Sequence, residues 1–397
     1  MHQPRQFDTA RQAIKLATIG LFISLLWLPN LEALFHWDDV PQVSEKRALA
    51  RLPCLQPGLS GLRTFVGGLE AFYNDHFGFR KRLVYWGQRW RKAWFQESPL
   101  PTVMIGRDGW LFYSVDQTLE DIRATTLFKP AQLQAWRSLL ECRRDWLARS
   151  GIRYLLVIAP DKHTIYPEKL PAWIHQVGPT TKLDQFMTYM KAHSTVPVLD
   201  LRPALRRAKQ HAVTYLIADT HWNQYGAFVG YQELIRTLSC QLPGLEPLPL
   251  SAFSTSTNTE SGGDLAAMLA EATTLENNCP VLQPRPPLVP LRPAADKADS
   301  RWLTTENPDR IGRAVLFRDS FSQRWVPLIG YHFNKVIYCW HYHWNRQLIE
   351  KEQPNVVIDE LNEHFFYQQE PDKLKLADAL DDPPLPPTRT AAVPMTR

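Results

Sequence analysis

Residues 151–160 read GIRYLLVIAP, a glycine followed by an apolar, partly β-branched run that ends at a proline. An amphipathic pattern precedes it from about Pro130 to Ser150, so Gly151 is placed to end a helix and the run to form a buried strand. A helix that leads into a wholly apolar strand is typical of α/β proteins with parallel sheets. The stretch therefore predicts the fold class.

The same alternation continues along the rest of the chain. Strand-like segments lie at 196–199, 214–217, 313–317, 335–340 and 355–359. Helical patterns separate most of them, including one over 224–238 and another after Ser320. The chain is therefore predicted to form an open, mostly parallel sheet with helices on both faces.

The N-terminus carries an uncharged apolar run, LATIGLFISLLWLPNL, at residues 16–31. Basic residues precede this run, namely Arg5, Arg11 and Lys15, and acidic residues follow it, namely Glu32, Asp38 and Asp39. This asymmetry places the N-terminus in the cytoplasm and exports the rest. The run is shorter than the roughly 20 residues of a usual spanning helix, so a cleaved signal peptide competes with an uncleaved anchor. We favour the anchor because no clean small-x-small cleavage site follows.

Composition narrows the possible partners. The net charge is +5, and the basic residues are spread along the chain rather than gathered in a stripe, so nucleic acid is not an expected partner. The five cysteines are too few and too scattered for a disulfide scaffold or a CxxC metal site.

An Asp-x-His pair stands in residues 218–227, ADTHWNQYGA. On an extended segment Asp219 and His221 point to the same side, just after the predicted strand at 214–217 and before a helix that Asn223 can cap. An aspartate beside a histidine fixes its tautomer and stabilises the imidazolium. His221 is therefore a candidate general base.

The nucleophile for such a base stands in residues 314–325, AVLFRDSFSQRW. The apolar strand ends at Phe317, and Ser320 falls at the strand-to-helix junction, where first-turn amides can hold an oxyanion. Taken alone, Ser320 could serve only as a helix cap. The Asp-x-His pair, taken alone, could be a turn followed by a histidine packed in the core. Both follow predicted strands, however, and the carboxyl edge of an open α/β sheet is its usual ligand crevice. Convergence of the three side chains is therefore predicted.

The chain resembles the SGNH-like alginate O-acetyltransferase family of periplasmic polysaccharide acetyltransferases. The matching segments, in order, are SEKRALARLP, FYNDHFGFRKRL, VMIGRDGWLFY, APDKHTIYPEKLP, DTHWNQYGA, GGDLAAML, RDSFS and PNVVIDELNEHFF, from Ser44 to Phe366. The resemblance implies an SGNH-like fold in permuted order, with Asp-x-His before the serine. It also implies that Ser320 accepts the acetyl group, His221 is the base and Asp219 orients it. Arg318 stands where the usual nucleophile block has glycine.

The resemblance also divides the chain. We expect a cytoplasmic tip and transmembrane signal-anchor at 1–35, a helical extension at 36–100, an SGNH-like catalytic domain at 101–370 and a disordered Pro-rich tail at 371–397. Within the catalytic domain, residues 246–305 are rich in Ser, Thr and Pro and are predicted to form a long loop or lid with one short helix after GGDLAAML.

Other residues are candidates for substrate binding. Lys162 and Tyr166 follow a strand end at the predicted ligand edge, and Arg318 lies beside the serine. Asp75 and Arg80 could line the cleft, although an interdomain salt bridge is the stronger interpretation for them.

A metal site is a weaker prediction, because only two ligands can be named. In CWHYHWN, His341 and His343 alternate onto one face of an extended segment, and no third ligand is identifiable. No metal and no cofactor are therefore expected.

The function predicted from these features is transfer of acetyl groups, through an acetyl-serine intermediate, to hydroxyls of an exported, alginate-like polysaccharide. The family's donor is supplied by a membrane-bound O-acyltransferase, which implies an inner-membrane protein with its catalytic domain in the periplasm. One alternative is an acetylesterase with the same triad. Another is a non-catalytic subunit that binds polysaccharide or bridges a secretion complex. The sequence does not specify the polymer.

Overall fold

The structure is a computed structural model that describes residues 4–35, 49–55, 57–80, 82–83, 86–87, 90, 100–114, 117–269, 276–288, 291, 293–295 and 302–379. Its internal contacts divide the chain into two units. The smaller unit comprises Met1–Met104 and Gly262–Leu275, and the larger comprises Ile105–Ser261 and Glu276–Arg397. Each unit is a separate body in the description that follows.

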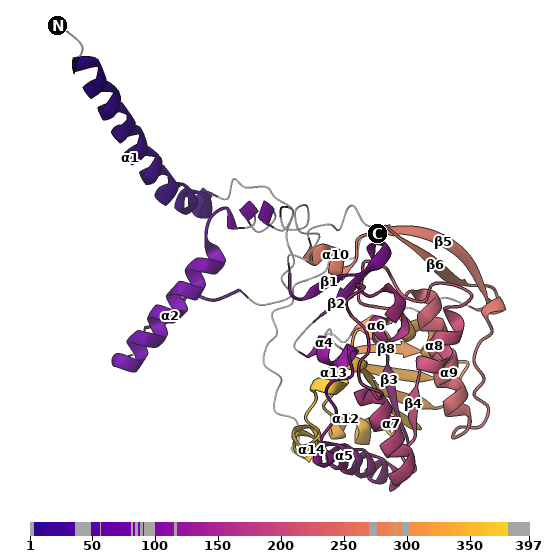
Figure 1. The fold of residues 1–397 in the computed structure, drawn as a ribbon. Helices are drawn as coiled ribbons and strands as arrows, with labels where there is room; N and C mark the ends of the chain where they lie inside the picture. Colours follow the sequence, from indigo (N-terminus) through magenta and orange to yellow (C-terminus); the bar gives the residue numbers. More distant parts are fainter. Residues whose placement is uncertain are drawn as a thin grey trace. The chain divides into compact units, whose positions relative to one another are not determined.

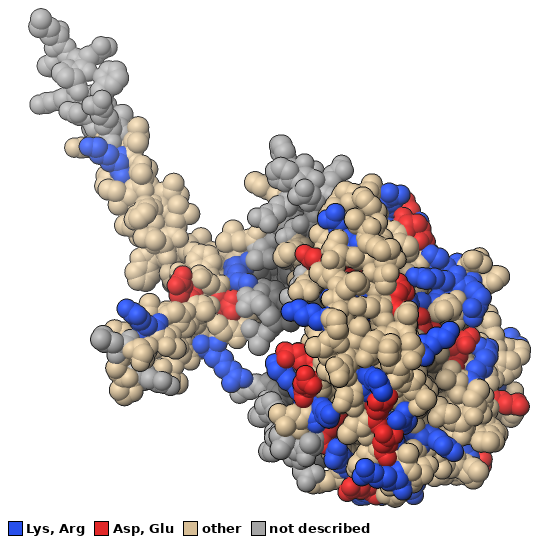
Figure 2. Space-filling view, turned by 60° about the horizontal axis from the view of Figure 1, so that its bottom comes forward, with Lys and Arg blue, Asp and Glu red and all other residues tan. Residues whose placement is uncertain are grey.

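The smaller unit begins with a long apolar helix, α1 (Pro4–Phe35). Its segment Gln12–Glu32 has 21 residues, a mean hydropathy of 1.6 and no burial. At 1.5 Å per residue this segment extends about 32 Å, which matches the hydrocarbon thickness of a bilayer. Figure 2 shows it almost without charged side chains. The helix is thus longer than the apolar run alone predicted, and it fits an anchor or a signal sequence.

The predicted helical extension is present in part. Helix α2 (Leu59–His76) forms within it. Residues 49–55 are not helical, and residues 36–48 lie outside the described chain. The short helix α10 (Asp264–Met268) lies within GGDLAAML rather than after it.

The larger unit is built on a seven-stranded sheet with the order β4-β3-β11-β9-β10-β8-β7. The strands are β3 (Arg153–Ala159), β4 (Val198–Asp200), β7 (Ala294–Ala295), β8 (Trp302–Glu306), β9 (Arg313–Phe317), β10 (Lys335–Cys339) and β11 (Val356–Asn362). The five strands from β4 to β10 pair in parallel, and β8 and β7 add antiparallel pairing at one edge. The mostly parallel sheet predicted from the sequence is confirmed.

Helices cover the sheet on both faces (Figure 1). The helices of this unit are α4 (Thr118–Ile122), α5 (Pro130–Ala148), α6 (Lys162–Ile165), α7 (Lys182–His193), α8 (Arg202–Ala208), α9 (Gln224–Ser239), α11 (Val326–Gly330), α12 (Arg346–Glu352), α13 (Glu363–Gln368) and α14 (Pro371–Ala379). Tyr154, Leu156 and Ile158 of β3 share one core with Trp136 of α5 and Phe186 of α7. The alternate β3 residues are buried on the other face, where α9 contacts the sheet. Burial on both faces explains why GIRYLLVIAP is apolar throughout.

Short strands and 3-10 turns are the remaining elements, and the first of them, β1, begins in the smaller unit and ends at the first residue of the larger one. They are β1 (Val103–Ile105), η1 (Arg107–Gly109), β2 (Leu111–Tyr113), η2 (Pro167–Lys169), η3 (Leu250–Ala252), β5 (Phe253–Ser261), β6 (Glu276–Pro284) and η4 (Phe321–Trp325). The Gly106 N–H donates to the Trp110 carbonyl at 2.7 Å across the Arg-Asp-Gly turn that joins β1 to β2.

The region predicted as a loop or lid at 246–305 contains more strand than expected. β5 and β6 form a long antiparallel hairpin, and β7 and most of β8 fall in the same region while belonging to the main sheet. Thr alternates with Ser, Asn and Glu along β5, and the consecutive residues 255–258 are all exposed, so no apolar alternation marked this strand.

Two further predictions were wrong. Residues 214–217 are not a strand of the sheet, because Tyr215 makes only an isolated bridge to Trp222. The tail does not begin at residue 371, because Pro371–Ala379 form α14 against α5. The physical reason is a buried ion pair, in which Arg143 of α5 donates to Asp378 at 2.7 Å. Residues 380–397 of the predicted tail lie outside the described chain.

Candidate active site

The Asp-x-His pair lies on a tight antiparallel turn at the start of α9. Leu216 N–H donates to the His221 carbonyl at 3.1 Å, and Asn223 N–H donates to the Thr214 carbonyl at 2.9 Å. A turn closed by these two bonds projects its tip, which carries Asp219, away from the helix. The pair therefore reaches its position through a turn rather than through a strand end.

The start of α9 holds this turn. Asn223 accepts from Gly226 N–H at 2.9 Å as the helix cap, as predicted, and donates to the Val213 carbonyl at 2.6 Å. A Cβ at Gly226 would lie 2.1 Å from the Thr214 carbonyl oxygen, so only glycine permits this approach. The sequence NQYG thus joins the helix to the turn that carries the candidate base.

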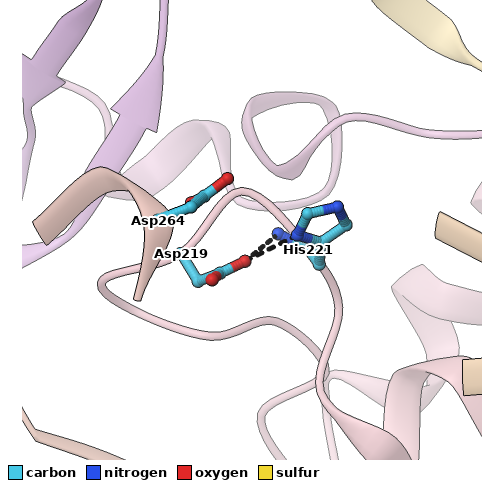
Figure 3. Close-up of side chains that lie close together, drawn as sticks. All are labelled: Asp219, His221 and Asp264. Carbon is cyan, nitrogen blue, oxygen red and sulfur yellow. Dashed lines mark hydrogen bonds and ion pairs between the residues drawn. The ribbon is translucent and has the colours of Figure 1, made fainter. Parts of the chain in front are cut away.

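Asp219 and His221 make two contacts through one oxygen. Asp219 Oδ1 accepts from the His221 backbone N–H at 2.9 Å and from His221 Nδ1 at 2.7 Å (Figure 3). A carboxylate that binds the backbone two residues ahead is a common turn for aspartate, which explains the Asp-x-His spacing. The second contact places the imidazole proton on Nδ1 and leaves Nε2 as an acceptor.

Ser320 follows β9 and meets that acceptor. Its Oγ lies 2.7 Å from His221 Nε2. Although Ser320 is the N-cap residue of η4, its side chain makes no capping hydrogen bond. The structure thus brings Asp219, His221 and Ser320 together in one hydrogen-bonded chain. The side chains of His221 and Asp219 are 24% and 17% exposed, so the chain is open to solvent.

Aromatic side chains pack against His221 in this hydrogen-bonded chain. The ring of Phe321 lies 4.9 Å from the His221 ring and 5.2 Å from the Trp222 ring, measured between centroids. Trp222 is fully buried, and its indole N–H donates to the Phe321 carbonyl at 3.0 Å. The tryptophan after the histidine therefore fixes the backbone that follows the serine.

Asp319, the residue before Ser320, is held by several buried hydrogen bonds. Asp319 accepts from Phe321 N–H at 2.8 Å, from Asn362 N–H at 2.8 Å and from the Tyr342 hydroxyl at 2.9 Å. Asp319 N–H in turn donates to Glu360 at 3.1 Å. Burial, followed by the nearby charge of Asp319, raises the pKa of Glu360 well above its ordinary value. A neutral Glu360 thus avoids a second negative charge beside Asp319.

Arg318 is not available to a substrate in this structure. The residue is 1% exposed, its guanidinium lies 4.6 Å from the Trp340 ring centroid, and it donates to the Asp319 carbonyl at 3.0 Å. Burial lowers the pKa of Arg318 from its ordinary value. The side chain thus turns inward from the strand end, and its predicted substrate contact stays a prediction.

Lys162 and Tyr166 are also buried rather than facing a substrate. Lys162 Nζ donates to three backbone carbonyls of the segment 216–219, and its residue is 4% exposed. The Tyr166 hydroxyl accepts from Thr214 N–H at 2.9 Å. The sequence placed both residues at the correct sheet edge, but the turn at 214–223 covers that part of the edge. Their predicted substrate contacts stay predictions.

Three other candidates have different surroundings. Asp75 and Arg80 belong to the smaller unit, where Asp75 accepts from Ala50 N–H at 2.8 Å. Their predicted roles in a cleft or an interdomain salt bridge stay predictions. The His341 ring lies 5.6 Å from the Phe317 ring and 6.5 Å from the Trp302 ring, between centroids.

Sequence reasoning missed a second histidine–aspartate pair at the same sheet edge. His364 Nδ1 lies 2.7 Å from Asp161 Oδ1, with both side chains more than nine-tenths buried. Burial alone would lower the pKa of His364 and raise that of Asp161, but their attraction reverses both directions. Both residues stood in quoted motifs, PDK and LNEHFF, yet no spacing rule joins positions so far apart.

A parallel sheet covered by helices on both faces, with a serine after one strand and Asp-x-His on an adjoining turn, defines an SGNH hydrolase-like domain. Residues 103–327 match the family described as "SGNH hydrolase-like domain, acetyltransferase AlgX". The match covers more than half of the chain, and the chain belongs to this family.

Individual relatives support this assignment. The "probable alginate O-acetylase AlgJ" of Pseudomonas syringae pv. tomato is 28% identical over 258 residues, which are 63% of this chain and 59% of the relative. The protein of that name from Pseudomonas aeruginosa is 32% identical over 142 residues, or 34% of this chain and 32% of the relative. The chain thus spans between about a third and three fifths of the curated relatives that it matches.

Solved structures share the fold. PatB1 of Bacillus cereus aligns with a TM-score of 0.50 and 18% identity over 68% of this chain and 96% of that chain. A DHHW family protein from Eubacterium siraeum aligns with a TM-score of 0.50 and 14% identity over 70% and 96% of the two chains. At these identities the likeness concerns the fold alone.

Proposed function

We propose that the protein is an O-acetyltransferase that moves acetyl groups through Ser320 onto hydroxyls of an exported polysaccharide. The observation that carries this proposal is the continuous hydrogen-bonded chain from Asp219 through His221 to Ser320, with contacts of 2.7 Å on both sides of the imidazole. Such a chain activates a hydroxyl that is otherwise a weak nucleophile. Family membership supports acetyl as the transferred group.

In the first half-reaction, Ser320 Oγ attacks the carbonyl carbon of an acetyl ester while His221 Nε2 takes the hydroxyl proton. Asp219 stabilises the resulting imidazolium through Nδ1. The bond from the carbonyl carbon to the donor oxygen then breaks, and His221 returns its proton to that leaving oxygen. The product of this half-reaction is an acetyl ester on Ser320.

In the second half-reaction, a sugar hydroxyl attacks the acetyl-serine and gives its proton to His221. The ester bond to Ser320 breaks, and the proton returns from His221 to Ser320 Oγ. Water in place of the sugar hydroxyl would give the esterase reaction with the same residues. The two activities therefore differ in the acceptor alone.

The acceptor class and location complete the proposal. Relatives named as alginate O-acetylases support a polyuronate acceptor. The 21-residue apolar segment of α1 supports an anchor in the bacterial inner membrane, with the larger unit in the periplasm. A membrane-bound O-acyltransferase would then present the acetyl donor at the same membrane.

Mass spectrometry with the full chain in detergent tests the proposal. The protein and a matched Ser320→Ala variant are incubated with an activated acetyl ester and a panel of polyuronate and neutral oligosaccharides. We expect acetylated polyuronate, and an acetyl group on the peptide that contains Ser320, from the parent protein alone. Acetate release without sugar acetylation in the presence of every acceptor would favour the esterase, and equal behaviour of parent and variant would overturn catalysis by Ser320.

A further inference from the structure

Lys162 is a buried lysine whose ammonium group donates to three backbone carbonyls. It opens α6 directly after β3, and its Nζ donates to the carbonyls of Leu216, Ile217 and Asp219 at 2.9, 3.0 and 2.7 Å. An ammonium has three donors, so these bonds use its full capacity. All three acceptors lie in the segment that leads to and includes the candidate orienting aspartate.

The surroundings of Lys162 strengthen these bonds. Its Nζ lies 5.7 Å from the ring centroid of Trp110 and 5.3 Å from that of Phe112. Both aromatic residues are at least nineteen-twentieths buried, so little water competes for the carbonyls. Hydrogen bonds from a charged donor in such surroundings are stronger than those between neutral groups.

The arrangement of the turn explains why a cation is needed there. Three carbonyl oxygens that converge on one point repel each other unless a donor lies between them. Without Lys162, the segment would rotate these carbonyls toward water, and Asp219 would move with its own carbonyl. Its carboxylate could then no longer contact both the backbone N–H and Nδ1 of His221.

We propose that Lys162 is a positioning residue for acyl transfer, which acts by holding Asp219, and through it His221, in register with Ser320. This inference rests on the proposed function of the same site. The PDK segment quoted in the sequence analysis thereby gains a role, because Lys162 fixes the turn instead of contacting the substrate. It touches no reacting atom, so it acts on the rate through geometry alone.

The chain offers a matched control in Lys209. Its Nζ also donates to a backbone carbonyl, that of Ile165, and lies 4.9 Å from the ring centroid of Tyr166. It also pairs with Glu168 at 3.1 Å. Lys209 thus resembles Lys162 in its chemistry, but none of these contacts reaches residues 216–221. Substitution of Lys209 therefore measures the effect of removing a partly buried lysine that does not hold the turn.

The experiment compares full-length parent protein with Lys162→Met and Lys209→Met in acetyl release from an activated ester. We expect kcat to fall about 10- to 100-fold for Lys162→Met, with KM changed less than about threefold. The pH at which the rate is half-maximal should also move, because Asp219 no longer orients His221. Lys209→Met should keep kcat within about twofold of the parent.

A second variant separates positioning from general loss of folding. Lys162→Ala leaves room beside the three carbonyls for a small primary alkylammonium ion, which should restore the rate in a saturable way, whereas tetramethylammonium should not. A parent no more active than Ser320→Ala would reject the proposed function itself. If the parent is active, an unchanged kcat in Lys162→Met, or no rescue of Lys162→Ala, would overturn the positioning role.

Discussion

Two histidine–aspartate pairs lie at the carboxyl edge of one sheet, and their internal contacts have the same length. Asp219–His221 and Asp161–His364 both have a separation of 2.7 Å between Nδ1 and the carboxylate. The first pair is partly exposed, and its Nε2 meets Ser320 at 2.7 Å. The second is more than nine-tenths buried, and within the described residues its Nε2 has no hydrogen-bond partner.

The difference shows what the shared contact does and does not provide. A carboxylate at Nδ1 sets the tautomer of a histidine in both cases. Only at His221 does the other nitrogen meet a nucleophile that solvent can reach. The buried pair instead joins the end of β3 to the start of α13, because Asp161 follows the first and His364 lies in the second. We therefore expect the Asp219–His221 pair to affect catalysis and the Asp161–His364 pair to affect stability.

The largest effect is expected when the partly exposed Asp219–His221 pair is broken. His221→Gln should lower kcat for acetyl release at least about 10³-fold, because the serine loses its base. The unfolding free energy should change little, since the side chain is partly exposed. Steady-state kinetics and urea unfolding in detergent measure the two quantities. His364→Gln is the matched control and should keep kcat within about threefold when corrected for folded protein.

A large loss of stability is expected from the buried pair. Asp161→Asn leaves His364 without its carboxylate and should lower the unfolding free energy by about 3 kcal/mol. Urea unfolding monitored by tryptophan fluorescence measures this change. Asp108→Asn removes an exposed carboxylate paired with Lys169 and should change nothing measurable. Equal effects of the two substitutions would show that burial does not distinguish these carboxylates.

A third histidine, which has no carboxylate at hydrogen-bond distance in the described structure, sharpens the contrast. Burial lowers the pKa of His332 to about 4, and its Nε2 lies 2.6 Å from the Tyr231 hydroxyl. Between about pH 6.5 and about pH 4, His332 therefore carries a proton in the unfolded chain but not in the folded chain. Acidification from about pH 7 to about pH 5 should cost about 2 kcal/mol of stability through this group. Urea unfolding of His332→Gln should show a shallower dependence on pH, and an unchanged slope would contradict the assignment.

The smallest expected effect is a pH dependence of opposite sign at His364. Asp161 raises the pKa of His364 against the effect of burial, so the folded chain holds this proton more tightly than the unfolded chain. The stabilisation is complete below about pH 6.5 and is lost as the pH rises through the folded pKa. The difference in unfolding free energy between parent and His364→Gln should shrink from about pH 6 to about pH 9. A difference that grows over this range would show that the pair is neutral in the folded protein.

The local pattern of the sequence predicted most of the larger unit. The apolar runs identified β3, β9, β10 and β11, since strands buried on both faces carry a continuous signal, and they also identified the half-buried edge strand β4. The same rule overlooked β7 and β8, which lie at one edge of the sheet, and it mistook 214–217 for a strand of the sheet. Two backbone hydrogen bonds close that turn, and the side chains of Asn223 and Asp219 hold it, which an apolar pattern does not encode.

The candidate site was predicted where function depends on adjacent residues and missed where it depends on distant ones. Asp219 and His221 lie two positions apart, and Ser320 follows a recognisable strand, so the Asp-x-His and the strand end were visible. Asp161 contacts a histidine 203 positions away, and Lys162 contacts carbonyls 54 to 57 positions away. Such contacts follow from strand order in the sheet, which one sequence does not determine.

The place of β11 in the sheet has a consequence for biosynthesis. This strand is the last of the sheet to be made, yet it lies between β3 and β9, which pair with it on either side. Until residue 362 has been translated, β11 is incomplete, and the edges of β3 and β9 that pair with it remain unpaired. Both edges must then be kept from other chains during synthesis, since unpaired strand edges promote aggregation. The order of synthesis thus makes the sheet close late, and the candidate catalytic edge forms only when nearly the whole described chain has emerged.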